Sequence, residues 1–393
     1  MKSNNKYLFI IGLIAVVNAL GYGIIIPVLY SYSQRFGLTD FQNGLLFAVF
    51  SLCQFFSTPI IGRLSDKYGR KPLLVLSLLG TAISFFMMAF APSALFLFIA
   101  RMLDGITAGN IQVASAVVSD TTEEKDRARG FGIMGAAFGF GFVFGPAISA
   151  LTVGISPSLP FIISGVVSLV AVLLTVIILP ETNKHIGEVK TTQLFHFGKM
   201  VRALFDKTLG VMFTITLLYS LAFSLFIYAF QPFAVKLLFL VPTQISFIFT
   251  LFGIVGLITQ ALVVHKLSAR FGLKNVYVFH MFMLSVCFFI MFFARDLASF
   301  SIVCIFLAFA NAVTQPLNNA IISRETDAKS QGSMLGLATS YMSVGQILGP
   351  LLGGVLASIM LELPFVAGGV FVLICFILSF NVLQKGFQKE SAF

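Results

Sequence analysis

Long apolar runs, each close to twenty residues, alternate with short polar turns along almost the whole chain. A helix of about 20 apolar residues is long enough to cross the hydrocarbon core of a bilayer. The pattern predicts twelve membrane-spanning helices, at residues 7–32, 41–62, 72–91, 94–119, 128–154, 159–179, 208–238, 243–267, 274–294, 297–322, 331–359 and 364–384. An even number of spans places both ends of the chain on the same side of the membrane.

The longest polar stretch, from Pro180 to about Lys207, divides these spans into two sets of six. The segment GFVFGP, which ends at Pro146, returns 204 residues later as GQILGP, which ends at Pro350. A parallel repeat of this kind is typical of secondary transporters, whose substrate site lies between the halves. We therefore expect an all-α membrane protein of two pseudo-symmetric six-helix bundles. The predicted parts are an N-terminal bundle at 1–180, a cytoplasmic linker at 181–207 and a C-terminal bundle at 208–393.

Composition and charge agree with a membrane protein and fix its orientation. The chain is 58% hydrophobic and only 10% charged, which excludes a soluble domain. If both termini are cytoplasmic, all but four of the 25 Lys and Arg residues lie on the cytoplasmic side, the exceptions being Arg35, Arg101, Lys236 and Arg295. We expect a multi-pass protein of the cell membrane, the inner membrane in a bacterium. The net charge of +10 is spread over loops, so it does not indicate nucleic acid binding.

Two opposite charges lie inside the fourth predicted span. Arg101 and Asp104 are three residues apart, so their side chains can meet on one helical face. At about 1.5 Å per residue they lie roughly 10 to 15 Å into the membrane, where a charge must face protein or water. The pair is either a structural ion pair or an arginine-tuned carboxylate that takes up and releases a proton. Gln112 continues the face of Asp104 at i+8 and suits a cavity lining.

Other polar and aromatic residues within the spans are candidates for a substrate cavity, although packing explains several equally well. An amide such as Asn18 can bond a neighbouring helix instead. The chain contains 46 Phe residues, so an aromatic stripe at helical spacing arises easily by packing alone. The predicted cavity residues are Asn18, Gln112, Phe223, Phe226, Phe230, Gln231, Asn311, Gln315 and Asn318.

The fifth predicted span is rich in glycine and contains a GxxxG pattern at Gly141 and Gly145, followed by Pro146. Small residues at this spacing let a helix approach a neighbouring backbone closely. The segment can serve as a rigid seal or as a hinge, and the sequence leaves both alternatives open.

The basic turn GRLSDKYGRKP, residues 62–72, joins two spans and therefore lies at a membrane face. With the fourth- and fifth-span patterns it resembles the twelve-span drug/proton antiporters of the major facilitator superfamily, and most closely the tetracycline efflux proteins. The resemblance implies that residues 62–72, hereafter the gate loop, close the cytoplasmic side through an Arg70–Asp120 contact, and that Arg101 assists proton transfer. The gate residues it implies are Gly62, Asp66, Gly69, Arg70 and Asp120. Its exporter-type fifth-span motif falls on Gly141, Gly145 and Pro146.

Two departures from the family pattern change what we expect of this chain. Asn18 stands nine residues before Pro27, where the family has an acid, so a proton or cation role there is lost. In the second half Ala269 stands where the gate loop has Asp66, which predicts a weaker latch. These departures argue against tetracycline itself as the substrate and make Asp104 the leading candidate for proton coupling.

We therefore expect a secondary active transporter that exports amphipathic or aromatic small molecules by alternating access, with the proton gradient as its energy source. The alternatives are an uptake symporter or uncoupled facilitator for a metabolite, and a non-transporting membrane receptor, for which the short loops leave little surface. An enzyme is not expected, because no nucleophile–base pair, metal cluster or phosphate loop is evident and the four His residues are scattered. We expect no metal, no cofactor and no nucleic acid, and a monomer whose partners are substrate, protons and lipid.

Overall fold

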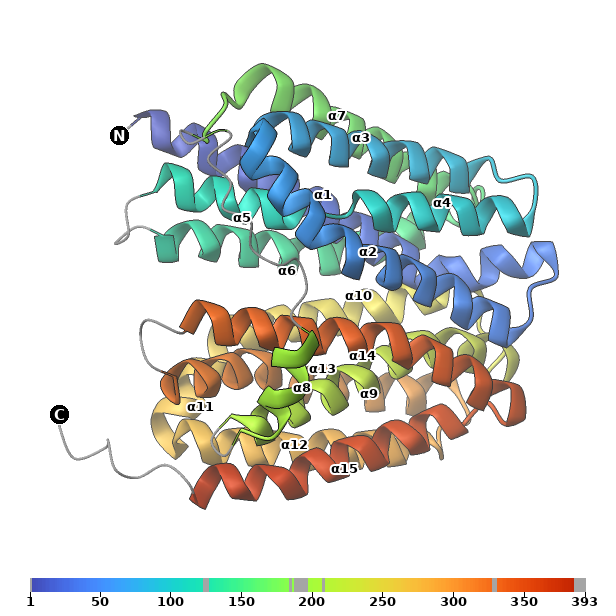
Figure 1. Ribbon diagram of the computed structural model, residues 1–393. Coiled ribbons are helices and arrows are strands. Elements are labelled where there is room, and N and C mark those ends of the chain that lie inside the picture. The colour runs from blue at the N-terminus through green and yellow to red at the C-terminus, as the bar shows by residue number, and fades with distance from the viewer. Residues whose placement is uncertain are drawn as a thin grey trace. The chain divides into compact units, whose positions relative to one another are not determined.

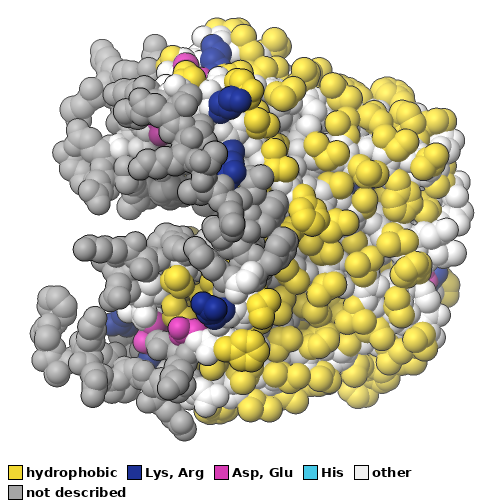
Figure 2. Space-filling model, viewed as in Figure 1, with side chains coloured by type: hydrophobic (Ala, Val, Ile, Leu, Met, Phe, Trp, Pro, Cys, Tyr) yellow, Lys and Arg dark blue, Asp and Glu magenta, His cyan; other side chains and the backbone are white. Residues whose placement is uncertain are grey.

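The computed structural model describes residues 2–122, 127–183, 186, 197–206, 209–326 and 331–384, and these residues form helices and no strand (Figure 1). Twelve helical segments in the described chain are long and apolar enough to cross a membrane. The all-α fold with twelve spans, predicted from hydropathy, is therefore confirmed. Hydrophobic side chains cover most of the described surface in Figure 2, as expected where lipid replaces water as the solvent.

The first half of the chain supplies the first six spans. Its elements are α1 (Lys2–Ser33), η1 (Gln34–Phe36), α2 (Asp40–Tyr68), α3 (Arg70–Ala89), α4 (Ala94–Thr107), α5 (Asn110–Thr121), α6 (Arg127–Thr152) and α7 (Leu159–Ile178).

The second half begins with a short helix inside the predicted linker and continues with the other six spans. Its elements are α8 (Phe197–Leu204), α9 (Gly210–Lys236), α10 (Pro242–Ile258), the π-helical turn η3 (Thr259–Val263), α11 (Val264–Phe271), α12 (Leu273–Met291), α13 (Leu297–Arg324), α14 (Gln331–Ile359) and α15 (Leu363–Gln384).

The fourth span is not one continuous helix, as the sequence predicted, but breaks between α4 and α5 at Ala108 and Gly109. The break occurs where α2 packs very closely. A Cβ atom at Gly105 would lie 2.5 Å from the carbonyl oxygen of Phe50, and one at Gly109 would lie 2.6 Å from Ile61. Gln112 lies on the other side of this interruption from Asp104, and its place on the same face stays a prediction.

The chain divides into two compact units. The first unit comprises Met1–Thr39, Val49–Leu194 and Val241–Thr250, and the second comprises Asp40–Ala48, Phe195–Leu240 and Leu251–Phe393. The domain boundaries at residues 180 and 208 stay a prediction.

The first unit contains a close seam between α1 and α6. A Cβ atom at Gly141 would lie 2.2 Å from the Cβ atom of Ala19, and one at Gly145 would lie 2.9 Å from the backbone of Gly23. Pro146 borders the same seam, with its Cδ atom 3.2 Å from where a Cβ atom of Gly23 would stand. The fifth-span glycines therefore bring two backbones together, as the GxxxG spacing predicted.

The second unit is packed around aromatic side chains. Phe226 lies at its centre, with its ring centroid 5.7 Å from that of Phe230, 5.9 Å from Phe288 and 6.2 Å from Phe365. All four side chains have at most 1% of their surface exposed. Burial of such rings gives this unit a dense apolar core.

Candidate functional site

A single residue, Gly69, connects α2 to α3 in the gate loop. Its φ of 104° and ψ of 156° lie in a region that residues with a side chain rarely adopt. Its amide donates to the carbonyl oxygen of Ser65 at 3.1 Å, which closes the last turn of α2. The turn therefore needs glycine, and it places Arg70 at the first position of α3.

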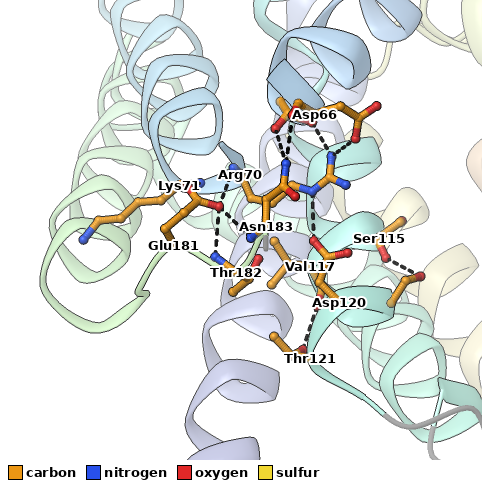
Figure 3. Close-up of polar contacts among 12 residues, drawn as sticks. Asp66, Arg70, Lys71, Ser115, Val117, Asp120, Thr121, Glu181, Thr182 and Asn183 are labelled. Atoms are coloured by element: carbon orange, nitrogen blue, oxygen red, sulfur yellow. Dashed lines mark hydrogen bonds and ion pairs between the residues drawn. The ribbon is translucent and has the colours of Figure 1, made fainter. Parts of the chain in front are cut away.

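The side chain of Arg70 joins two helices at this end of the first unit (Figure 3). Its guanidinium lies 2.5 Å from Oδ1 of Asp66 at the end of α2 and 2.9 Å from Oδ2 of Asp120 on α5. It also donates to Oγ of Ser65 at 2.7 Å. Only 11% of the Arg70 side chain is exposed, so its charge is largely matched by protein groups. The Arg70–Asp120 contact implied by the resemblance is present in the structure.

Glu181, just beyond α7, contacts the gate loop, and the sequence analysis missed it. Its Oε1 atom accepts from the amide of Arg70 at 2.9 Å, and its Oε2 atom accepts from the amide of Lys71 at 3.1 Å (Figure 3). Asn183 donates from Nδ2 to the carbonyl oxygen of Asp66 at 2.9 Å. An acid directly after Pro180, at the end of a span and opposite a basic loop, was the available signal.

The intramembrane charges form the pair that the i+3 spacing allowed. Nη1 of Arg101 lies 2.9 Å from Oδ2 of Asp104, and the two residues are 2% and 6% exposed. The guanidinium also stands over the ring of Phe50 on α2, 4.2 Å from its centroid. Among the described residues, Nε of Arg101 has no hydrogen-bond partner. The carboxylate of Asp104 is thus paired with one close cation and shielded from solvent, so a proton on Asp104 would leave that cation unbalanced.

The first-half cavity candidates do not gather around this pair. Nδ2 of Asn18 donates to the carbonyl oxygen of Ile14 at 2.9 Å, one turn earlier on the same helix. Gln112 is exposed on α5, beyond the helix break. In the described part of the chain, neither amide is hydrogen-bonded to Arg101 or Asp104, and their role in a cavity stays a prediction.

The aromatic stripe of the seventh span faces the interior of the second unit. Phe226, Phe230 and Gln231 on α9 are completely buried, whereas Phe223 is half-buried. The ring of Phe230 packs 4.7 Å from that of Phe300, measured between centroids. The packing interpretation fits these buried side chains, and of the stripe only Phe223 keeps the accessibility that a cavity lining needs.

The three amides of the tenth span differ in burial and in hydrogen-bond partners. Asn318 is buried: its Oδ1 atom accepts from Tyr277 and its Nδ2 atom donates to Thr216, both at 2.9 Å. Asn311, which is half-buried, accepts from the hydroxyl of Tyr219 at 2.5 Å, and Gln315 is exposed. Asn318 therefore ties α9, α12 and α13 together, while Asn311 and Gln315 remain the accessible pair.

Among the described residues, no three His, Cys, Asp or Glu side chains are grouped so that they could hold a metal ion. The four cysteines Cys53, Cys287, Cys304 and Cys375 are free thiols in or beside apolar segments. The candidate chemistry of the described chain therefore rests on the Arg101–Asp104 pair and on the network around Arg70.

Comparison with known proteins gives the same family over nearly the whole chain. A family model described as Major Facilitator Superfamily matches residues 11–237 and 212–390. The class C tetracycline resistance protein of Escherichia coli is 31% identical, over 95% of this chain and 96% of that protein. Multidrug resistance protein 2 of Bacillus subtilis is 28% identical, over 95% of this chain and 94% of that protein.

Solved structures with low sequence identity share the fold. A bacterial homologue of the human lysosomal transporter Spinster superposes with a TM-score of 0.80 at 14% identity, over 96% of each chain. The human organic anion transporter MFSD10 gives a TM-score of 0.70 at 20% identity, over 96% of this chain and 99% of that one. These two likenesses concern the arrangement of helices alone.

Proposed function

Because this chain belongs to the Major Facilitator Superfamily, we propose that it exports amphipathic, aromatic small molecules in exchange for protons. Relatives at 28% to 31% identity over almost their full length are named for tetracycline and multidrug resistance, which supports export of drug-like compounds. The observation that carries the coupling is the buried Arg101–Asp104 ion pair. Transport in place of catalysis, without cofactor or metal, is part of the proposal.

In the proposed mechanism Asp104 is the group that binds and releases the proton. Arg101 lies 2.9 Å from an ionised Asp104 and neutralises it, which lowers the free-energy cost of holding the two charges in the membrane. A proton that arrives from outside neutralises Asp104 and releases Arg101 from it. The unpaired cation then favours the conformation in which water or another group can reach it. Substrate favours the opposite conformation, so proton entry drives substrate exit.

The network around Arg70 is proposed to stabilise the state closed to the cytoplasm. It joins the ends of α2, α3 and α5 through three partners of one guanidinium, and charge-assisted bonds of this type are about twice as strong as neutral ones. The proposal places this end of the first unit, and both chain termini, in the cytoplasm of a cell whose plasma membrane holds the protein. The excess of Lys and Arg in the predicted inner loops supports that orientation.

The test is reconstitution in liposomes with a pH-sensitive dye inside and a panel of cationic, neutral and anionic aromatic drugs. The wild-type protein should move protons when one class of drug is added, and Asp104→Asn should abolish that flux. Asp296→Asn is the matched control, because Asp296 is an exposed helix cap and Asn caps a helix equally well.

Two outcomes would contradict the proposal in different ways. Proton flux that persists in Asp104→Asn would remove Asp104 from the coupling. No flux with any drug, in protein that a thermal melt shows to be folded, would favour an uncoupled facilitator. Counterflow of substrate without a pH gradient would then identify that facilitator.

A further inference from the structure

The first residues after α7 contact both sides of the gate loop. Glu181 accepts from the amides of Arg70 and Lys71, which open α3, and Asn183 donates to the carbonyl oxygen of Asp66 in the last turn of α2 (Figure 3). Residues 181–183, hereafter the linker anchor, therefore bridge the turn at Gly69. They also begin the polar stretch that connects the two halves of the chain.

The contact of Glu181 stabilises the N-terminal end of α3. The first amides of a helix have no partner within the helix, and the helix dipole is positive at that end. The carboxylate of Glu181 satisfies two of these amides at once, on two different oxygens. The same carboxylate accepts from the amides of Thr182 and Asn183 at 2.9 and 2.8 Å, which fixes its own backbone in place.

The space around Gly69 is occupied by this carboxylate. A Cβ atom at Gly69 would lie 2.3 Å from Oε2 of Glu181, closer than any real contact. The glycine is thus needed twice, once for its positive φ and once to admit the acid. Lys71 adds a further tie, since its Nζ donates to the carbonyl oxygen of Val176 in the last turn of α7 at 2.8 Å.

We propose that Glu181 is a positioning residue of the gate, which holds the first turn of α3 so that Arg70 points at Asp66 and Asp120. Through Asn183 the linker anchor moves with the gate loop as one body. The linker is thereby attached to the gate itself, and not merely to the end of a span. This inference rests on the proposed gating function of Arg70, but the contact itself can be measured without any transport.

Hydrogen–deuterium exchange of the full-length protein in liposomes measures the contact directly. Glu181→Ala removes the acceptor of the Arg70 and Lys71 amides, so their exchange should become about tenfold faster, as expected for the loss of a hydrogen bond to a charged group. Glu181→Gln should have a smaller effect, because one acceptor oxygen remains. The matched control is Thr182→Val, because Oγ1 of Thr182 is buried and has no hydrogen-bond partner among the residues that the structure describes. In this variant the exchange of the Arg70 and Lys71 amides should stay unchanged.

Transport measurements then separate positioning of Arg70 from a merely structural role. Glu181→Ala should lower the maximal rate about tenfold and leave KM for the drug nearly unchanged, because the substrate does not contact the anchor. In an Arg70→Ala background the same substitution should change the maximal rate by less than about twofold. The backbone amide of residue 70 is still present there, so a purely structural effect would persist.

Several results would overturn the inference. Unchanged exchange of the Arg70 and Lys71 amides in Glu181→Ala would show that the contact does not hold the turn. Faster exchange together with equal loss of transport in both backgrounds would assign Glu181 a structural role only. If the wild-type protein moves no drug, the exchange result still decides whether the contact exists, and only the gating function fails.

Discussion

The gate loop and its counterpart in the second half, residues 265–274, have the same backbone and different chemistry. In each, one glycine joins two helices with positive φ: 104° at Gly69 and 80° at Gly272. Each glycine amide donates at 3.1 Å to the backbone carbonyl oxygen of a serine four residues earlier, which is Ser65 in the first loop and Ser268 in the second. The repeat has therefore kept the turn itself, down to one hydrogen bond.

The side chains around the two turns differ in almost every respect. Leu273 follows Gly272 where Arg70 follows Gly69. Oγ of Ser268 has no hydrogen-bond partner in the described part of the chain, whereas Oγ of Ser65 accepts from Arg70. In the second loop, Lys274 forms an ion pair with Glu325 at 3.0 Å. The comparison teaches that the fold requires the turn, while the network that could act as a latch belongs to the first loop.

The largest difference is expected when each loop loses its cation. Arg70→Ala removes the shared partner of Asp66 and Asp120, so the maximal transport rate should fall at least about tenfold. Lys274→Ala removes one partly exposed ion pair and should change the rate by less than about twofold. Drug efflux from liposomes, normalised to the amount of folded protein, measures both. Equal losses would mean that the two loops share the latch.

Substitution of each glycine by alanine should separate the effect of backbone strain from the effect of a steric clash with Glu181. Both positions have backbone angles that cost a residue with a side chain about 1 to 3 kcal/mol. Gly69→Ala adds a collision with Glu181, whereas the nearest atom to a Cβ at Gly272 is Nδ2 of Asn275 at 3.8 Å. The midpoint of thermal unfolding in detergent should therefore fall further for Gly69→Ala. Introducing Glu181→Ala with it should recover part of the loss, and no recovery would mean that strain alone explains it.

The two serines are expected to differ by a smaller amount. Ser65→Ala removes a hydroxyl that accepts from Arg70 and should destabilise the protein by about 1 to 2 kcal/mol. Ser268→Ala removes a buried hydroxyl without a partner, so it should be neutral or slightly stabilising. Thermal melts of the two variants test this directly. A destabilisation of similar size at both sites would contradict the contrast.

The smallest effect is expected when the second loop is given the residues of the first. Ala269→Asp with Leu273→Arg restores an acid and an arginine four residues apart, a pair that is worth about 0.5 kcal/mol or less on its own. Arg324 follows Ser323 as Asp120 follows Ser119, so the second loop offers a cation where the first offers an acid. Transport should change by less than about twofold. A large slowing would show that a latch needs no second acid.

Much of the molecule follows from local features of the sequence. Apolar length determined the twelve spans, since the hydrocarbon core sets a minimum length for each helix. The three-residue spacing of Arg101 and Asp104 determined that the two charges meet, and the gate-loop motif implied the Arg70–Asp120 pair. Each of these features depends on residues that are near one another along the chain, or on a family pattern that identifies both residues of a contact.

Only the tertiary structure decided which distant side chains meet. Glu181 lies 111 residues from Arg70, and nothing local links an acid after one span to the first amides of another. The close approach of α2 to Gly105 and Gly109 depends on how the helices pack, and the burial of Phe226 depends on rings from α12 and α15. Hydropathy and helical period specify where a helix runs and which faces are apolar, but the choice of neighbour is set by packing, which sums contacts over the whole fold.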